Sequence, residues 1–408
     1  MLNESSCRVC AGVVREFLDF GRQPLSDAFL SSDRIADEFF YRLAVGVCGD
    51  CAMVQLMEEV PRERMFREDY PYQSRGSAGM RAHFRGVAMN FLVEELGGPD
   101  PFIVELGCND GVMLRTLAEA GVRHLGVEPS GAVADLAAAE GVRVCKEFFE
   151  ESLAERIRDE DGPADVIYAA NTLCHVPYLN SVLSGVRTLL GDRGVFVFED
   201  PYLGDIVAKN SFDQIYDEHF FLFSARSVDE AARRNGLELV DVDRLLVHGG
   251  EVRYTLAKPG VRRRTPAVAA LLHEEERRGL ADMATLTAFA ERVCAVRRDL
   301  VALLTDLRAG GARVVGYGAT AKSATVTNFC GIGPELVEFI SDSTPAKQGR
   351  LAPGSHIPVR TPAEFADPYP EYALLFAWNH ADEIIAKEEA FRKEGGTWIT
   401  YVPEVRLL

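Results

Sequence analysis

The sequence lacks any long apolar run, and this absence excludes a membrane-spanning helix. Its longest strongly hydrophobic stretches, residues 195–198 and 372–378, have the length of strands, whereas a helix needs about 20 apolar residues to cross a bilayer. The N-terminus also lacks the basic and then apolar pattern of a secretory signal. We therefore expect a soluble cytoplasmic protein that does not bind membranes.

Basic side chains are scarce relative to acidic ones. The chain has 44 Lys and Arg against 62 Asp and Glu, which gives a formal net charge of −18 at pH 7. A nucleic acid is a dense polyanion that needs a concentrated basic surface, and no segment here supplies one. We expect no nucleic-acid partner, although a few local Lys and Arg are enough to hold a diphosphate.

Low-complexity segments and internal repeats are also absent, so the 408 residues, 47% of them hydrophobic, predict two or three globular domains. Residues 1–72 form a short, loop-rich block with paired cysteines. Residues 73–258 alternate strand-like runs (102–106, 124–128, 166–170 and 195–199) with helical segments, which is typical of a doubly wound parallel sheet. In residues 259–408, one long helical stretch at 265–308 precedes a second βα series with strands at 314–317, 337–341, 373–377 and 398–402. The sequence thus predicts an α/β protein with a small N-terminal module, a doubly wound middle domain and a C-terminal Rossmann-like domain.

Nine cysteines, an odd number, argue against a disulfide framework. Five are scattered singly and fit small buried hydrophobic residues. The other four form two Cys-x-x-Cys pairs, Cys7 with Cys10 and Cys48 with Cys51. Four thiolates suit tetrahedral Zn²⁺ and leave no open coordination position, so we predict a structural zinc that stabilises the N-terminal module. Coincidental pairs, a redox pair and a nucleic-acid-binding zinc ribbon are the alternatives, and the acidic balance disfavours the last.

A cofactor site is indicated where the strand at 102–106 runs into a turn with Gly107 and Gly111. Glycines at such a turn let the backbone approach a ligand closely, and Glu105 at the strand end can hold a cationic or hydroxylated group. The next strand ends at Glu128, which is placed to accept hydrogen bonds from both hydroxyls of a ribose. The alternative is that both glycines are ordinary turn residues and that Glu128 lies on the surface.

The glycine pattern discriminates between two ribosylated cofactors. Dinucleotide sites use Gly-x-Gly-x-x-Gly to make room for a pyrophosphate, whereas here the middle position is Asn109. S-adenosylmethionine carries no phosphate, so a polar turn suits it better. We therefore predict a methyltransferase, with Phe149 beside the adenine and Asn171 near the sulfonium as further cofactor ligands.

The reacting group is expected beyond the ends of the fourth and fifth strands of this domain. His175 follows the fourth strand, and residues 212–219, after the fifth, include Tyr216, Glu218 and His219. Methylation of a carbon needs a base beside a carbonyl and a donor for the enolate oxygen. His219 is the candidate base, Tyr216 and His175 are donors or alternates, and Glu218 orients the site. Taken singly, each of these residues also fits a structural role.

The turn at 316–323, after the first strand of the last block, opens a helix whose free N–H groups suit a phosphate. Lys322 and Ser323 are predicted diphosphate ligands, with Lys347 and Asn379 at later strand ends as further candidates. A glycine corner with a solvated lysine is the alternative. If the turn held a dinucleotide instead, an oxidoreductase would be the natural interpretation.

The whole chain resembles the bacterial sugar C-3 methyltransferases that make the branched deoxysugars of antibiotics. The resemblance rests on residues 69–72, 105–111, 171–175, 212–219, 248–253, 316–323 and 377–380. It implies a four-cysteine zinc module, a domain that binds S-adenosylmethionine, and a C-terminal domain that helps to hold a dTDP-linked 4-keto-deoxysugar. It further implies methyl transfer to carbon 3 with inversion, with His219 as the base and Tyr216, Glu218 and His175 around it.

Tyr70 and Tyr72, in the Asp-Tyr-Pro-Tyr stretch, are candidates to cover the substrate, although the stretch also fits a plain proline turn. Three other functions stay open: an O- or N-methyltransferase acting on a nucleotide sugar, an NAD-dependent sugar oxidoreductase, and a non-catalytic zinc scaffold. The sequence does not determine whether carbon 3 carries an amine or a hydroxyl, or the D or L series of the sugar. We expect a monomer, because three domains can close around one cleft.

Overall fold

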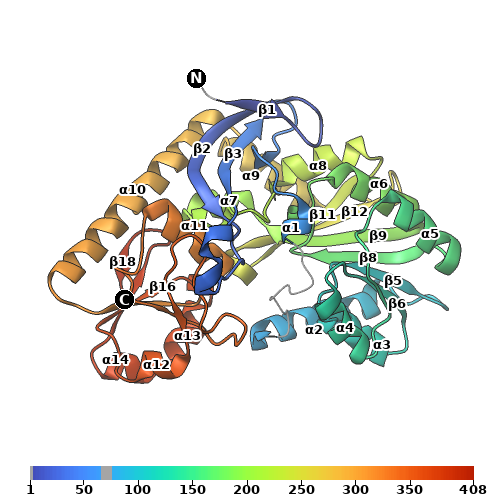
Figure 1. The fold of residues 1–408 in the computed structure, drawn as a ribbon. Coiled ribbons are helices and arrows are strands. Elements are labelled where there is room, and N and C mark those ends of the chain that lie inside the picture. Colours follow the sequence, from blue (N-terminus) through green and yellow to red (C-terminus); the bar gives the residue numbers. More distant parts are fainter. Residues whose placement is uncertain (1–2, 66–75) are drawn as a thin grey trace.

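Three β-sheets organise residues 3–65 and 76–408, which are the residues that the computed structural model describes (Figure 1). The first sheet carries the paired cysteines, the second forms the middle of the chain and the third lies near the C-terminus. The predicted architecture, an N-terminal module followed by two α/β domains, is confirmed. Tyr70 and Tyr72 lie outside the described residues.

The N-terminal sheet is antiparallel and has the order β1-β2-β3-β4-β10. Its elements are β1 (Glu4–Ser6), β2 (Val13–Pro24), β3 (Phe40–Cys48), β4 (Val54–Leu56) and β10 (Phe221–Leu222), with η1 (Ser32–Asp37) and α1 (Arg62–Met65) beside them. The block is thus less loop-rich than expected, since the long strands β2 and β3 fill the interval between the cysteine pairs. Its last strand, β10, comes from the middle of the chain and pairs with β4.

The middle sheet has the order β11-β12-β9-β8-β5-β6-β7. Its strands are β5 (Phe102–Leu106), β6 (Arg123–Val127), β7 (Val144–Cys145), β8 (Ala164–Ala170), β9 (Leu190–Pro201), β11 (Glu238–Leu245) and β12 (Glu251–Ala257). The strands from β5 to β9 are parallel, and β12 runs antiparallel to both of its neighbours. The chain reverses its direction of winding between β5 and β8, and this switch point is where an open α/β sheet binds its ligand.

Helices cover both faces of the middle sheet (Figure 1), and for this reason every residue of its central strand β5 is buried. They are α2 (Ala78–Glu94), α3 (Val112–Glu119), α4 (Gly131–Ala139), α5 (Glu151–Asp161), α6 (Leu179–Leu189), α7 (Leu203–Lys209) and α8 (Ala225–Arg234), with the short turns η3 (Leu173–His175), η4 (Phe212–Gln214) and η5 (Val247–Gly249). Ile103 of β5 packs in one core with α2 and α3, and Val104 packs in the other with α5 and α6. Alternate residues of one strand therefore serve opposite cores.

The long helical stretch expected at 265–308 is two helices, α9 (Pro266–Arg277) and α10 (Met283–Ala309). Gly279 adopts a left-handed φ of 57° between them, and a Cβ atom there would lie 2.6 Å from the Asp282 carboxylate. A backbone in this conformation cannot continue an α-helix. The apolar periodicity runs through the break, which is why the sequence pattern suggested a single helix.

The C-terminal sheet has the order β15-β14-β13-β16-β17-β18 and is parallel except for β18. Its elements are β13 (Val314–Tyr317), α11 (Ala321–Cys330), β14 (Ile340–Ser341), β15 (Val359–Arg360), α12 (Pro362–Ala366), β16 (Tyr372–Leu375), η6 (Trp378–His380), α13 (Ala381–Lys387), α14 (Glu389–Lys393), β17 (Thr397–Thr400) and β18 (Arg406–Leu407). Winding reverses between β13 and β16, so this sheet also has a switch point, from which α11 starts.

An aromatic cluster joins the three parts of the chain. Phe20 of β2 meets Phe329 of α11 edge to face at 5.0 Å and stacks on Phe212 of η4 at 6.2 Å between ring centroids. In Figure 1, β2 lies close to both α10 and α11. The three sheets are therefore packed against one another around η4.

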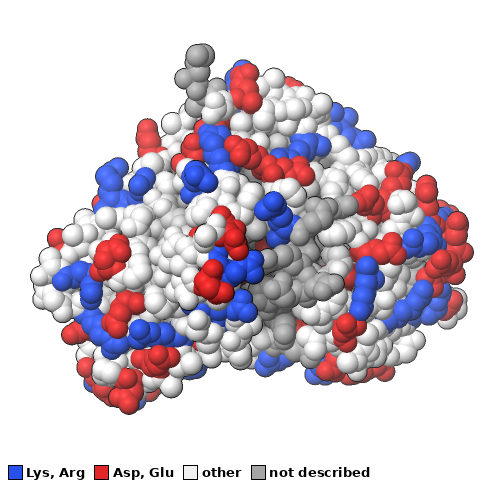
Figure 2. All heavy atoms as spheres, in the orientation of Figure 1, with Lys and Arg blue, Asp and Glu red and all other residues white. Residues whose placement is uncertain are grey.

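The surface carries charges of both signs. Figure 2 shows Lys and Arg interspersed with Asp and Glu over the described part of one face. Among the described helices, none combines the length and the apolar composition that crossing a membrane requires.

Candidate active site

The four paired cysteines converge at the end of the N-terminal sheet. The sulfur of Cys7 lies 3.6 Å from that of Cys51, and the sulfur of Cys10 lies 3.4 Å from that of Cys48. All four sulfur atoms fall within 4.8 Å of one another. A tetrahedral zinc with Zn–S bonds of about 2.3 Å sets its sulfurs about 3.8 Å apart, and a disulfide would need about 2.05 Å. The donor set fits structural zinc and leaves no open coordination position.

The turn after β5 depends on its two glycines. Gly107 and Gly111 both have left-handed φ angles, 67° and 72°. A Cβ atom at Gly107 would lie 2.4 Å from the Thr172 hydroxyl, and one at Gly111 would lie 2.9 Å from the Cβ of Ala137. Conformation and space thus both require glycine, and the turn brings its backbone to the switch point.

Two predicted carboxylates flank this turn. Glu128, just after β6, accepts hydrogen bonds from the backbone N–H groups of Asn109 (3.0 Å) and Ser130 (2.8 Å), which fixes its orientation. Because a carboxylate has about four lone-pair positions, it can still accept hydrogen bonds from a ligand's hydroxyls. Glu105 is buried, its Oε2 makes no hydrogen bond to any described residue, and burial raises its pKa. Such an unpaired buried oxygen fits a site for a polar ligand.

Asn171 and Phe149 are placed differently with respect to the switch point. Asn171 follows β8 directly, has a left-handed φ of 48° and donates its N–H to the carbonyl of Glu199 (2.7 Å). Phe149 is buried in the core, with one ring carbon 3.2 Å from the position of a Cβ on Gly185 of α6. Its role beside an adenine stays a prediction.

Residues 212–219, which we call the junction segment, are attached to the C-terminal sheet. Asp213 accepts hydrogen bonds from the indole N–H of Trp378 (2.6 Å) and the hydroxyl of Tyr401 (2.7 Å). The hydroxyl of Thr325, on α11, donates to the carbonyl of Ile215 (2.9 Å). These bonds tie the predicted catalytic residues to the second switch point.

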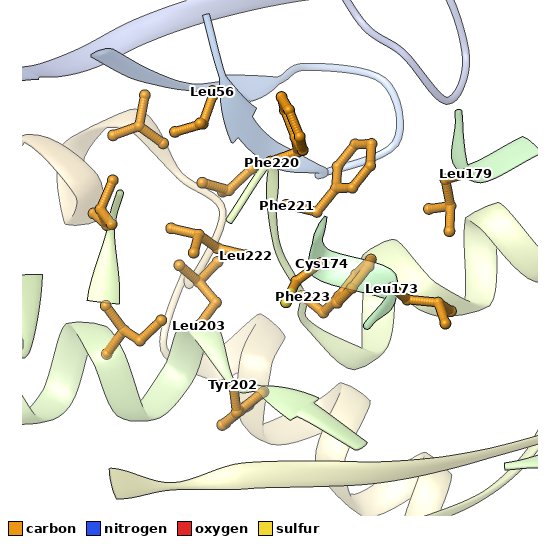
Figure 3. Packing of buried hydrophobic residues seen from close by; sticks show 14 of the residues in the cluster. Leu56, Leu173, Cys174, Leu179, Tyr202, Leu203, Phe220, Phe221, Leu222 and Phe223 are labelled. Carbon is orange, nitrogen blue, oxygen red and sulfur yellow. The ribbon is translucent and has the colours of Figure 1, made fainter. Parts of the chain in front are cut away.

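The same segment is attached to the zinc-binding sheet. Asp217 accepts a hydrogen bond from the N–H of Ser26 (3.0 Å), and the chain then enters β10, where Phe221 pairs with Gln55 of β4. Figure 3 shows Phe220 and Phe221 in the packed apolar layer beside Leu56. The junction segment therefore joins the N-terminal sheet to the C-terminal sheet.

His219 is held in one tautomer. Its Nδ1 lies 2.7 Å from the carbonyl oxygen of Gln214, and because a carbonyl only accepts, Nδ1 carries the proton. Nε2 then accepts the hydrogen bond from the Tyr216 hydroxyl, at 2.7 Å. Burial lowers the pKa of His219 well below its usual value and raises that of Tyr216. The pair is thus a neutral imidazole that accepts a hydrogen bond from a neutral phenol.

His175 stacks on His219, with ring centroids 5.1 Å apart, and burial lowers its pKa to about 4. Glu218 is buried beside them at 4% exposure. The structure thus brings together all four residues that were predicted for catalysis.

The four predicted diphosphate ligands differ in their hydrogen bonds and positions. Lys322 lies at the second switch point. Its Nζ is buried, 5.0 Å from the ring centroid of Trp378, and makes no hydrogen bond to a described residue. Asn379 follows in η6. Ser323 donates its hydroxyl to the carbonyl of Thr320 (2.6 Å) within its own turn. Lys347 donates to the carbonyl of Ala319 (2.9 Å) and pairs with Asp27 (3.2 Å). The positions suit Lys322 best, and the roles of all four stay predictions.

Sequence reasoning missed three residues that shape this site. Gln214 fixes the tautomer of His219 through its backbone, which no side-chain pattern reveals. Asp213 anchors the junction segment, and its position inside the stretch 212–219 was an available signal. Glu251 is buried at 1% exposure with Asn171 beside it, and burial raises its pKa. It lies in the stretch 248–253, which had been noted without a role.

Comparison with known proteins gives three family matches that together span most of the chain. A zinc binding domain matches residues 7–66, a methyltransferase domain residues 81–242, and a C-methyltransferase C-terminal domain residues 246–403. The C-methyltransferase NovU of Streptomyces niveus is 35% identical over 408 residues, which covers 98% of this chain and 96% of that protein.

Two solved methyltransferase structures each cover less than half of this chain. The magnesium protoporphyrin IX methyltransferase of Synechocystis PCC 6803 with bound S-adenosylmethionine has 13% identity and a TM-score of 0.33, covering 44% of this chain and 80% of that one. The CcbJ methyltransferase of Streptomyces caelestis has 18% identity and a TM-score of 0.34, covering 43% and 89%.

Proposed function

This chain belongs to the C-methyltransferase family of S-adenosylmethionine-dependent enzymes, and from that premise we propose that it methylates carbon 3 of a dTDP-linked 4-keto-deoxysugar through an enolate. The observation that most supports the proposal is the hydrogen-bonded pair of the buried His219 and the partly buried Tyr216, which lies in the segment that joins the N-terminal and C-terminal sheets. We place the reaction in the cytoplasm, in the synthesis of a branched deoxysugar for an antibiotic, and propose three domains (1–72, 73–258 and 259–408) in a monomer.

The cofactor would be held by Glu105, Glu128, Asn171 and the turn from Gly107 to Gly111. S-adenosylmethionine supplies an electrophilic methyl group on a sulfonium. Glu128 would accept hydrogen bonds from the ribose hydroxyls, and Glu105 would face the positively charged amino end. The turn's polar Asn109 and its two glycines leave the backbone free to contact that end directly.

The chemistry proposed for the pair follows from its hydrogen bonds. When the sugar binds, the Tyr216 hydroxyl donates its hydrogen bond to the 4-keto oxygen of the sugar instead of to Nε2 of His219. The lone pair of Nε2 is then free. Nε2 removes the proton from carbon 3, and the electron pair of that C–H bond forms the enolate. The Gln214 carbonyl, 2.7 Å from Nδ1, stabilises the imidazolium that results.

The electron pair of the enolate would form a carbon–carbon bond between carbon 3 and the methyl group that S-adenosylmethionine supplies. The carbon–sulfur bond would break, S-adenosylhomocysteine would leave, and the ketone would be restored. The Tyr216 hydroxyl stabilises the oxygen while it carries negative charge. Lys322, at the second switch point, would neutralise the diphosphate of the same substrate, with Trp378 and Asn379 beside it.

The identity of the methylated atom can be tested with substrate labels. We expect the enzyme to transfer one methyl group to a dTDP-4-keto-deoxysugar in a small panel of amino and hydroxy sugars, as read by mass spectrometry. When the substrate carries deuterium at carbon 3, the product should lack the label, because the base removes the hydrogen of carbon 3 before the methyl group is transferred. A methylated product that keeps its deuterium would identify an O- or N-methyltransferase and contradict the proposal.

Replacing Glu128 with Ala should weaken cofactor binding by roughly 10- to 100-fold, since the ligand loses hydrogen bonds to a charged group. Calorimetry with S-adenosylhomocysteine measures the affinity directly. The matched control is Glu119→Ala, which removes an exposed carboxylate on α3 and should leave affinity unchanged. Equal affinity in Glu128→Ala and the native enzyme would show that the ribose is held elsewhere.

A further inference from the structure

A second cluster of metal-ligating side chains lies apart from the four-cysteine centre, beside the proposed base. Cys174 and His175 end the short turn η3, and His219 ends the junction segment. One ligand atom from each of the three lies within 4.8 Å of the others. Metal bonds of about 2.0–2.3 Å place one sulfur and two nitrogens of a tetrahedral site about 3.3–3.5 Å apart, so the cluster needs a contraction of at most about 1.5 Å to enclose an ion.

The His219 ring is already oriented as a metal-bound imidazole would be. Ligating histidines commonly donate their other ring N–H to a backbone carbonyl, which fixes the tautomer and the ring plane. Here the Nδ1–H group makes that bond to Gln214 at 2.7 Å, and this leaves Nε2 as the donor atom. The hydroxyl of Tyr216, 2.7 Å from Nε2, is placed to provide a fourth ligand.

The other two ligands approach from a different element. Cys174 is buried at 1% exposure, and Figure 3 shows it beside Phe223 and Leu173 under the apolar layer. His175 is the one of the three ligand residues that is only partly buried. A thiol and two imidazoles form a soft to borderline donor set that favours Zn²⁺, Co²⁺ or Cd²⁺ over Mg²⁺ and Ca²⁺.

We propose that Cys174, His175 and His219 form a binding site for one soft divalent metal ion, such as Zn²⁺, and that its occupation inhibits the enzyme. Inhibition rests on the proposed function, because an ion bound to Nε2 occupies the lone pair that removes the proton from carbon 3. The site binds the ion whether or not that function is correct. The four-cysteine zinc and this inhibitory ion are therefore separate, and the chain holds two zinc ions when both sites are filled.

Metal content measures the site without reference to catalysis. The full chain, with zinc retained in the four-cysteine centre, is equilibrated with buffered micromolar Zn²⁺ and its metal is counted. We expect two ions per chain in the native protein and one in Cys174→Ala. Cys330→Ala, which removes another buried cysteine, should keep two. Co²⁺ added to the zinc-containing protein should produce a sulfur-to-cobalt absorption band in the native protein that is lost in Cys174→Ala.

Inhibition is then measured as turnover with Zn²⁺ relative to turnover of the same variant without it. Added Zn²⁺ should reduce this ratio at least tenfold in the native enzyme and leave it near one in Cys174→Ala, while Mg²⁺ affects neither.

Cys174→Ser keeps the volume of the side chain with a weaker ligand, so it should bind the second ion at least tenfold more weakly even if the alanine variant folds poorly. A single ion in the native protein, or a second ion that persists unchanged in both Cys174 variants, would overturn the site. If two ions bind but the deuterium label is retained in the product, the site stands and the proposed function fails.

Discussion

Replacing His219 with Asn is expected to slow methyl transfer by roughly two to four orders of magnitude, the usual contribution of a general base. Asparagine has no basic nitrogen, so carbon 3 would have to lose its proton to water or to a weaker base. Affinity for S-adenosylhomocysteine should stay near that of the native enzyme, because Glu105, Glu128 and the glycine turn belong to β5, β6 and the turns that follow these strands. Single-turnover kinetics and calorimetry separate the two effects.

A second histidine, His273, serves as the control for the loss of turnover in His219→Asn. His273 is exposed on α9, and His273→Asn should leave turnover unchanged. Tyr216→Phe keeps the imidazole and removes the donor for the enolate oxygen, so it should slow turnover by about 10²-fold, within the range known for lost oxyanion donors. Near-normal turnover in His219→Asn would remove the imidazole from the role of base.

Local sequence was enough to predict the glycine turn between β5 and α3, which we propose holds the cofactor. Gly107, Gly111 and Glu105 lie within a few residues of one another, and their conformations follow from a single strand-to-helix connection. The strands at 102–106 and 314–317 were predicted with the bounds that the structure has, because short apolar runs between glycine turns are a strong signal. The break at Gly279 was missed, since only the backbone conformation reveals it.

The contacts that hold His219 and Tyr216 in place could not be predicted from local sequence. Asp213 is bound by Trp378 and Tyr401, which are 165 and 188 residues away in the sequence. The pairing of β10 with β4 likewise joins segments that no periodicity relates. The sequence could single out the residues proposed for the chemistry, whereas the contacts that hold them in place depend on how three sheets pack.

The second large effect is expected from removing the structural zinc. The four cysteines that would hold it belong to the N-terminal sheet, whereas the cofactor turn belongs to the middle sheet. Removing the metal with a chelator, or by Cys48→Ser together with Cys51→Ser, is expected to reduce turnover to roughly 1% or less and to lower the melting temperature. Structural zinc contributes an apparent binding free energy of about 10–16 kcal/mol in small zinc domains, so the N-terminal sheet should not keep its structure without it. Zinc content, thermal unfolding and turnover are measured on the same sample.

Turnover should fall because the zinc-binding sheet helps to position His219. Cys48 ends β3, β3 pairs with β4, and β4 pairs with β10, which begins two residues after His219. The N–H of Leu56 also donates to the carbonyl of Phe220 (3.0 Å). When β4 is lost, the junction segment loses its attachment to the N-terminal sheet and keeps its contacts to the C-terminal sheet and to His175 of η3, so the imidazole is held less firmly in its position.

The cofactor site should respond differently to the same treatment. Strands β5 and β6 pair with β7 and β8, and none of these belongs to the N-terminal sheet, so affinity for S-adenosylhomocysteine should change less than tenfold. Cys294→Ser, which alters an exposed cysteine, is the control and should keep zinc, stability and turnover. A zinc-free enzyme with native turnover would show that the junction segment is positioned without the N-terminal sheet. Loss of cofactor affinity in parallel with turnover would instead mean that zinc holds the whole chain together rather than the catalytic imidazole in particular.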